Sequence, residues 1–192
     1  LAPGIWRLLL RGRTIRQGLV DVWAVDNNRQ LVVRFLDFVD HQVKIGAPGS
    51  AASAVTVAGA ITKVQWANID GQMEEYPGVV GAISPSSSAG PLRTGAAKPD
   101  VTAPGEWIVS TMSAGSQHPR PYIIDDRHVA QYGTSMSSAL LAGIAALLLE
   151  RDPRLTYAQF KALLKPQSAI PNRPAGAFDP HWGYGLIDML KL

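Results

Sequence analysis

The sequence contains no cysteine among its 192 residues. Disulfide bonds, cysteine-ligated zinc sites and thiol catalysis are therefore excluded, although no cellular compartment is. It also lacks any apolar run of roughly eighteen residues, so no transmembrane helix is predicted. Residues 1–4 show neither an initiator methionine nor the layout of a signal peptide, and we expect the chain to begin within a longer protein.

Charged residues are also scarce, at 17% of the total against 46% hydrophobic residues. This balance is typical of a folded globular protein and argues against intrinsic disorder. Eighteen basic and fifteen acidic residues give a net charge of +3. The basic residues near the start, which are Arg7, Arg11, Arg13 and Arg16, alternate with apolar residues and form no block. We interpret them as the solvated face of strands and expect no nucleic-acid partner.

Residues 1–44 have the composition of β-strands. Their β-branched and aromatic residues are concentrated in short segments separated by glycine, asparagine and aspartate. The predicted strands span residues 5–10, 19–25 and 31–35. About forty residues of this kind are too few to form a stable unit alone, so we expect them to complete a larger β-structure.

From residue 45 the pattern indicates an α/β fold. Short apolar runs predict buried strands at residues 54–59 and 107–111. Residues 81–95 are rich in glycine, proline and serine and predict a loop. Residues 136–149 contain no proline and are almost all apolar from Ala139 onward, which predicts a buried helix.

Two further helices are predicted towards the end of the chain. Thr156 has the position of an N-cap, and Gln159 completes a capping box. Leu155 and Phe160 have the spacing of a hydrophobic staple, and Pro166 ends this helix. The last short helix is predicted at residues 186–190.

Residues 133–137, Gly-Thr-Ser-Met-Ser, lie where a loop enters the predicted buried helix. Gly133 allows a sharp turn, and the free amides of the first helical turn can bind a developing oxyanion. Apolar packing behind the helix would hold the Ser135 hydroxyl in a fixed orientation. A serine at a helix start is also commonly a plain N-cap, so the position alone leaves both roles open.

Other segments support the catalytic interpretation, because they match one family in order. The matching segments are residues 55–60 (Val-Thr-Val-Ala-Gly-Ala), 87–91 (Ser-Ser-Ala-Gly-Pro), 98–105 (Lys-Pro-Asp-Val-Thr-Ala-Pro-Gly), 133–136 (Gly-Thr-Ser-Met) followed by Gly143, and 182–188 (Trp-Gly-Tyr-Gly-Leu-Ile-Asp). Together they strongly resemble the subtilisin-like serine proteases, or subtilases. Residues 1–44 resemble the end of the jelly-roll-like insertion that some subtilases carry.

The resemblance implies a fold, a domain division and a reaction. Residues 45–192 would be the C-terminal half of the subtilisin-like three-layer α/β sandwich, a parallel sheet with helices, and residues 1–44 the β-rich end of an inserted domain. The implied function is that of a serine endopeptidase acting on polypeptides. Ser135 would be the nucleophile, with Gly133 and Thr134 as its backbone support, and no cofactor is expected.

The remaining catalytic groups of a subtilase are expected upstream of this chain. In the family the order is Asp, His, then Ser, and the oxyanion asparagine follows a glycine. Here Asn27, Asn28 and Asn68 precede Ser135, and none is in that setting. The upstream half of the peptidase domain is therefore an expected partner, and the isolated chain is expected to be inactive. A protease-like binding or scaffold protein is the alternative.

The histidines offer a second alternative. His41, His118 and His128 are outside any family histidine motif, and we interpret them as surface or hydrogen-bonded residues. His181 follows Asp179 and Ser135 in the order found in α/β-hydrolases, which would make the protein an esterase. Against this, the nucleophile elbow requires Gly-x-Ser-x-Gly, and the last position here is Ser137.

Three further expectations concern the surroundings of the site. After Met136 the family continues with two small residues, then Pro and His, whereas this chain has Ser137, Ser138, Ala139 and Leu140. Met136, next to the nucleophile, is expected to be sensitive to oxidation. Some subtilases hold structural calcium, but the acidic clusters at residues 26–28 and 125–126 lack an ordered ligand spacing. The family also suggests an extracellular or cell-envelope location.

Overall fold

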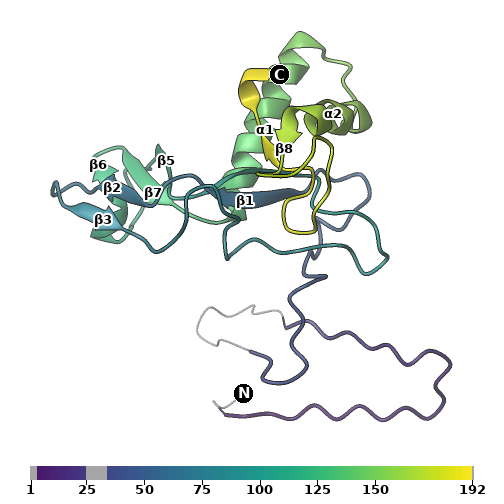
Figure 1. The fold of residues 1–192 in the computed structure, drawn as a ribbon. Helices are drawn as coiled ribbons and strands as arrows, with labels where there is room; N and C mark the ends of the chain where they lie inside the picture. Colours follow the sequence, from purple (N-terminus) through teal and green to yellow (C-terminus); the bar gives the residue numbers. More distant parts are fainter. Residues whose placement is uncertain (1–3, 25–33, 192) are drawn as a thin grey trace. The chain divides into compact units, whose positions relative to one another are not determined.

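The computed structural model describes residues 4–24 and 34–191, and the chain divides after Asp40 into two units (Figure 1). Within the first unit, residues 4–24 and 34–40 contain neither helix nor strand, and all of them are exposed. The strand predicted at residues 5–10 is therefore wrong, as is the described part of that at 19–25. The strand at 31–35 lies mostly outside the described residues. A strand requires a hydrogen-bonded neighbour, and no described segment pairs with these residues. Their assignment to an inserted domain stays a prediction.

The second unit is built around a mixed four-stranded sheet. Its strands are β1 (Val57–Ile61), β4 (Val101–Glu106), β9 (Leu186–Ile187) and β8 (Ser168–Ala169), in that order. Strands β1, β4 and β9 are parallel, and β8 is antiparallel to β9. The α/β fold predicted from the sequence is confirmed. Most residues of β1 and β4 are buried, as expected for the apolar centre of such a sheet.

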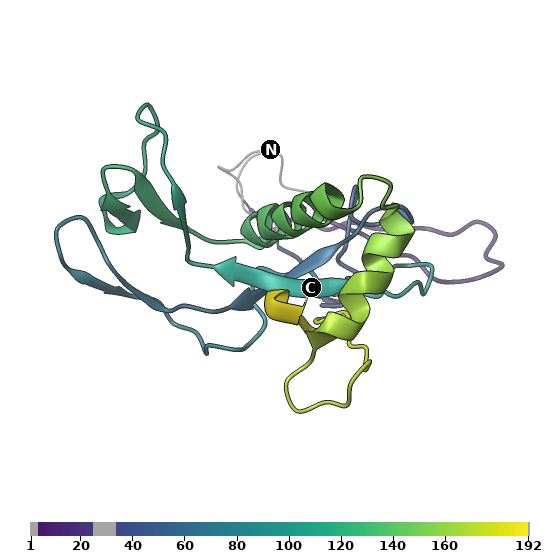
Figure 2. The same cartoon turned by 90° about the horizontal axis from the view of Figure 1, so that it is seen from above.

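Two helices pack against the sheet (Figure 2). They are α1 (Thr134–Arg151) and α2 (Tyr157–Leu164). Short 3-10 turns follow at Lys165–Gln167 and Met189–Lys191. The shared core consists of residues from both helices and two strands, namely Val101, Ala103, Leu141, Ile144, Phe160, Leu164 and Ile187. This core fixes α1, which carries residues 134–137, against β1 and β4.

Beyond the carboxyl ends of β1 and β4 the chain forms small antiparallel sheets (Figure 1). One pairs β2 (Gln65–Ala67) with β3 (Met73–Glu75), and the other has the order β5 (Ile108–Thr111), β7 (His128–Gln131), β6 (Ile123–Asp125), with a 3-10 turn at Arg120–Tyr122 before β6. Trp66 and Trp107 stack between them at a centroid distance of 4.3 Å. Of these strands the sequence predicted only β5.

The end of the chain differs from the prediction. The capping box of α2 is confirmed, with Thr156 and Gln159 bonded reciprocally. The helix predicted at residues 186–190 is wrong, because Leu186 and Ile187 form β9 and only residues 189–191 make a 3-10 turn. Leu186 pairs with Thr102 of β4 and with Ala169 of β8, so tertiary strand pairing overrides the local helical pattern.

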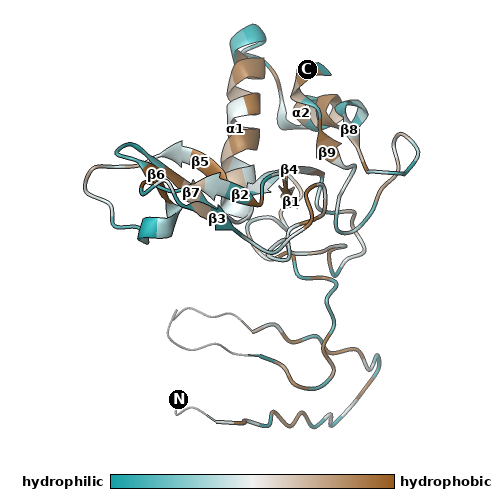
Figure 3. Ribbon diagram, turned by 60° about the vertical axis from the view of Figure 1, so that its left-hand side comes forward, coloured by the Kyte–Doolittle hydropathy of each residue, from teal (hydrophilic) through white to brown (hydrophobic). Residues whose placement is uncertain are grey.

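Helix α1 is apolar along most of its length (Figure 3), as its sequence predicts, but it is buried on one side only. Ser137, Leu141 and Ile144 are buried, whereas Leu147 and Leu149 are 58% and 41% exposed. The prediction of burial on all sides is therefore wrong for this chain, because no described segment covers the outer face. Within residues 4–24 and 34–191, no helix is long and apolar enough to cross a membrane.

Candidate active site

A glycine connects strand β7 to helix α1 and sets the direction of the helix. Gly133 is the N-cap of α1 and has φ 118°, a conformation that side chains rarely allow. Its amide donates a hydrogen bond to the carbonyl oxygen of Gly105, at a distance of 2.7 Å. Because Gly105 is near the end of β4, this bond fixes the start of α1 at the carboxyl edge of the parallel strands.

Two residues of the first turn hold α1 against the sheet. Ser137 is fully buried, and its Oγ lies 3.3 Å from the carbonyl oxygen of Ala103. A Cβ added to Gly59 would lie 3.3 Å from that Oγ and 3.5 Å from the Thr134 Cγ2 atom, so both side chains face β1. Residues three apart in a helix share a face, which explains why Thr134 and Ser137 point inwards together.

Ser135 is exposed, in contrast to Thr134 and Ser137. Its hydroxyl and its backbone amide make no hydrogen bond to any described residue. Ser135 is the second residue of α1 and not its N-cap, so the plain capping role does not apply. The site thus presents a free hydroxyl beside free amides at the positive end of an 18-residue helix.

The position agrees with a general rule for α/β folds. Ligand sites in such sheets lie beyond the carboxyl ends of the parallel strands. Strands β1 and β4 end at Ile61 and Glu106, and the residue before α1 is bonded to Gly105, the last residue but one of β4. This geometry supports Ser135 as the group that meets a substrate.

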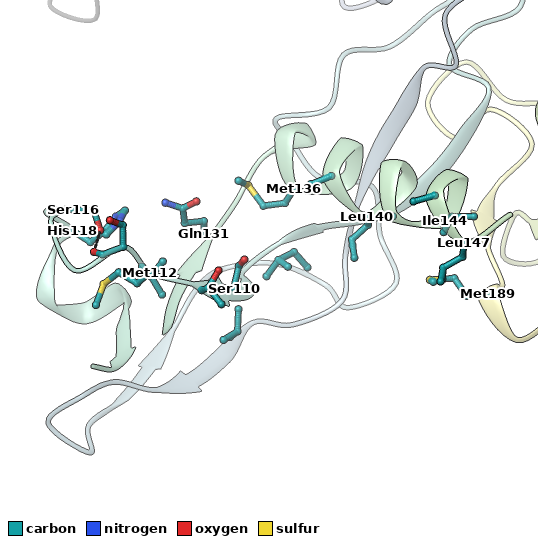
Figure 4. Close-up of a pocket in the computed structure, with 18 of the residues that line it drawn as sticks. Ser110, Met112, Ser116, His118, Gln131, Met136, Leu140, Ile144, Leu147 and Met189 are labelled. Atoms are coloured by element: carbon teal, nitrogen blue, oxygen red, sulfur yellow. Dashed lines mark hydrogen bonds between the residues drawn. The ribbon is translucent and has the colours of Figure 1, made fainter. Parts of the chain in front are cut away.

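A groove of about 830 Å³ runs along α1 and β5 (Figure 4). It is lined mainly by apolar side chains, including Met136, Leu140 and Leu147. His118 lies at one end with Ser116, and Gln131 lies between His118 and Met136 (Figure 4). His118 makes no hydrogen bond to a described residue, so no carboxylate of the described chain orients it as a catalytic base.

His128 forms the one histidine–carboxylate pair among the described residues. Its Nδ1 atom lies 2.8 Å from Oδ1 of Asp125. A hydrogen bond from the Arg127 amide and a second from His128 hold the pKa of the Asp125 carboxyl below its ordinary value. His128 begins β7, however, and each residue of a strand advances by about 3.4 Å, so the pair lies roughly 10 Å before Gln131 and farther from Ser135.

His41 contacts a lysine, and His181 lies next to a residue bonded near the start of β4. His41 is exposed and its Nδ1 atom lies 2.8 Å from Lys44 Nζ. The residues after His181 bind the opposite end of β4, where Thr102 Oγ1 donates to the Trp182 carbonyl at 2.7 Å. The α/β-hydrolase alternative is unsupported, because β4 separates His181 from the start of α1.

Comparison with known proteins decides the family. The profile described as "Subtilase family" matches residues 4–185. The chain belongs to the subtilase family. Serine protease AprX of Bacillus subtilis is 34% identical over 129 residues, covering 63% of this chain and 26% of AprX. Subtilisin E of Bacillus subtilis is 28% identical over 179 residues, covering 87% of this chain and 42% of the relative.

A solved protease structure has a similar fold. The CspB protease of Clostridium perfringens matches with a TM-score of 0.55 and 24% identity, over 78% of this chain and 28% of that chain. The present chain thus spans roughly a quarter to two fifths of the length of these relatives.

Other positions singled out in the sequence have structural roles or lie outside the described part. The buried Asn68 closes the β2–β3 turn, since its Oδ1 accepts from the amides of Asp70 and Gln72 at 2.9 Å. Asn27 and Asn28 lie outside the described residues, as does the acidic cluster at 26–28. Within residues 4–24 and 34–191, no group of three histidine, aspartate or glutamate side chains could hold a metal ion. The expectation of no cofactor stays a prediction.

The sequence did not identify the residues that let α1 approach the subtilase sheet. A Cβ on Gly105 would lie 2.5 Å from Ser137 Oγ and 3.0 Å from the Gly59 Cα atom. Gly59 and Gly105 each belong to one of the family-matching segments, and their lack of a side chain is the available signal. Glu106, buried directly after Gly105, was not recognised at all.

Proposed function

We propose that the protein is a serine endopeptidase in which Ser135 is the nucleophile. The observation that carries the proposal is the exposed Ser135 hydroxyl at the start of α1, beside a backbone amide without a partner among the described residues. Family membership supports the same reaction. The positions of the other catalytic groups come from the resemblance.

Each group has a defined role in the proposed reaction. Ser135 Oγ attacks the carbonyl carbon of the peptide bond while a histidine takes its proton. The Ser135 amide donates a hydrogen bond to the oxyanion, and Gly133 and Thr134 hold that amide in position. The histidine returns the proton to the leaving amine, and water then releases the acyl group by the reverse sequence.

The histidine, its aspartate and the oxyanion asparagine are proposed to come from an upstream half of the same domain. In support, no histidine of the described chain both lies beside Ser135 and has an orienting carboxylate. The exposed apolar face of α1 and the groove beside it provide a surface for this half. Leu147, at 58% exposure, would become buried on assembly.

The test uses the full-length protein and a fluorophosphonate probe, which labels activated serines. We expect labelling and casein cleavage, with both lost in Ser135→Ala. This chain alone should show neither, because a serine hydroxyl without its base is a weak nucleophile. Cleavage that survives Ser135→Ala would refute the assignment, and a folded full-length protein without labelling would favour a binding or scaffold role.

We also propose, on the family resemblance alone, that the protein acts outside the cytoplasm or in the cell envelope. Fractionation of cells that produce it, followed by immunoblotting, tests this location. Recovery of all of the protein with a cytoplasmic marker would contradict it.

A further inference from the structure

A second cavity, of about 100 Å³, lies beside the end of β4. Its walls include Tyr76, Glu106, Trp107 and Tyr132, and the proposed mechanism uses none of them. A volume of this size holds a few water molecules, so it suits a small head group better than a bulky aromatic side chain.

Glu106 supplies an acidic group that has no basic partner in the described part of the chain. The residue is 5% exposed, and no Lys, Arg or His side chain of the described chain forms an ion pair with it. Ser84 Oγ donates to its Oε1 atom, and Ser86 Oγ lies 3.2 Å from the same oxygen. The other oxygen, Oε2, accepts no hydrogen bond from a described residue. Glutamates are rarely this buried unless they are paired.

Aromatic rings surround the same space. The Trp107 ring lies 4.6 Å from that of Tyr76 and 4.9 Å from that of Tyr132, measured between centroids. Trp107 is 1% exposed, whereas Tyr76 and Tyr132 are 42% and 50% exposed, so the tyrosines stand at the mouth. Aromatic faces attract cations, and an adjacent carboxylate adds to this attraction.

The backbone of Trp107 is constrained at this point. Its φ is 55°, which is unusual for a bulky residue, and such conformations concentrate at ligand clamps and active sites. Its buried Nε1–H has no acceptor among the described residues. A buried indole N–H usually finds a partner, so this missing bond is a second unusual feature of Trp107.

The cavity is close to the proposed nucleophile in the chain and in space. Tyr132 precedes Ser135 by three residues. The hydrogen bond from the Gly133 amide to the Gly105 carbonyl, 2.7 Å long, joins the Ser135 loop to the residue before Glu106. A side chain bound here would thus belong to a residue near the bond that Ser135 attacks.

We propose that this cavity binds an arginine or lysine side chain of the polypeptide substrate and selects for it. The inference rests on the proposed peptidase function. Glu106 Oε2 accepts a hydrogen bond from the cation, and the rings of Tyr76 and Tyr132 flank its apolar stem and charged head. The buried carboxylate favours a charged side chain over a neutral one of the same shape, because the neutral side chain would leave Glu106 without a cationic partner.

The first test is cleavage of a mixed peptide library by the full-length protein, with product ends identified by mass spectrometry. We expect arginine and lysine to be enriched about fivefold or more at one position near the cleaved bond, and Glu106→Gln to remove most of this enrichment. Tyr76→Leu, at a half-exposed position, should reduce it partially. Glu75→Gln, which removes an exposed carboxyl outside the cavity, should leave it unchanged.

Equal enrichment in the wild type and in a folded Glu106→Gln variant would overturn the proposal. A second test is independent of cleavage and uses the Ser135→Ala protein. Blocked peptides that contain arginine should bind about tenfold more tightly than the same peptides with neutral citrulline, by isothermal titration. If cleavage fails but this difference is present and requires Glu106, only the proposed function is refuted. If cleavage occurs without the difference, only the cavity proposal is refuted.

Discussion

The Ser137 hydroxyl oxygen lies 3.3 Å from the Ala103 carbonyl oxygen, at the point where α1 packs on β4. The space around this hydroxyl is limited by Gly59 and Gly105, where added Cβ atoms would lie 3.3 and 2.5 Å from it. The glycines therefore set the distance between the helix and the strands. Ser135 is on the opposite side of the same helical turn. The packing of Ser137 therefore also fixes the position of Ser135 relative to the ends of the strands.

Gly105→Ala should destabilise the protein. The new Cβ would meet Ser137 Oγ and the Gly59 backbone, and such overpacking typically lowers the free energy of unfolding by about 1–3 kcal/mol. Urea unfolding of the full-length protein, followed by tryptophan fluorescence, measures the change. Adding Ser137→Ala should recover part of the loss, because it removes the nearer of the two atoms.

Gly115→Ala provides the matched control for this experiment. An added Cβ at Gly115 would have no described atom within 4 Å, and the residue has no positive φ, so the substitution should be neutral or slightly stabilising. Equal unfolding midpoints for the Gly105 and Gly115 variants would show that the helix does not depend on the close approach.

The Lys-Pro-Asp motif forms a buried ion pair, and its loss should be costly. Lys98 Nζ lies 2.7 Å from Asp100 Oδ2 and 3.0 Å from Thr56 Oγ1, and the Lys98 side chain is 4% exposed. Removing one partner of a buried pair costs about 3–5 kcal/mol when the other charge is left unpaired, and the contact of Asp100 with Lys161 lowers this cost. Lys98→Met should therefore clearly lower the free energy of unfolding, as measured by urea unfolding of the full-length protein.

Lys161 also contacts the Asp100 carboxyl, so the cost of losing each lysine can be compared. Its Nζ lies 2.7 Å from Asp100 Oδ1, but its side chain is 32% exposed. Lys161→Met should cost clearly less than Lys98→Met, since Asp100 keeps its buried partner. The reverse order in the same denaturant series would contradict the geometry.

The sequence predicted those features that depend on local signals. The capping box of Thr156 and Gln159 needs only neighbouring residues, so its helix was predicted at the right place. The Gly-Thr-Ser-Met segment indicated where a loop enters a helix for the same reason, and α1 begins within it at Thr134. The antiparallel strands around Trp66 and Trp107 depend instead on distant partners, and most of them were missed.

The candidate site shows the same limit. The serine could be found from its motif, but the side chains around it were brought together by the fold. Glu106 and Tyr76 are thirty residues apart in the sequence and line one cavity. No periodicity or spacing in the chain signals that juxtaposition.

The ion pair between Asp70 and Arg120 should make stability depend on pH. A side-chain hydrogen bond from Arg120 holds the pKa of the Asp70 carboxyl below its ordinary value of 3.8. A depressed pKa stabilises the fold above 3.8, and the contribution is lost as pH falls through the folded-state pKa. Asp70→Asn should therefore lower the thermal unfolding midpoint slightly at pH 7. It should have little effect at a pH below the folded-state pKa of Asp70.

The exposure of this pair keeps the expected effect small. Thermal unfolding from pH 7 down to pH 2.5, wild type against variant, measures it. Asp126→Asn is the control, because Asp126 is exposed and forms no ion pair with a described residue. A gap between wild type and Asp70→Asn that widens as the pH falls would reverse the predicted sign.

Oxidation of Met136 should inhibit the proposed peptidase without unfolding it. Met136 follows Ser135 directly, is partly exposed and lines the groove beside α1. Its sulfoxide would place a bulky polar group next to the amide that binds the oxyanion. Peroxide should therefore reduce casein cleavage by the full-length protein, and Met136→Ala should retain its own initial activity under the same treatment.

Met73, which is 66% exposed on β3 away from α1, is the control, because Met73→Ala should remain as sensitive as the wild type. Peroxide that oxidises Met136, as judged by peptide mass mapping, while cleavage continues unchanged would show that this side chain does not border the reacting atoms.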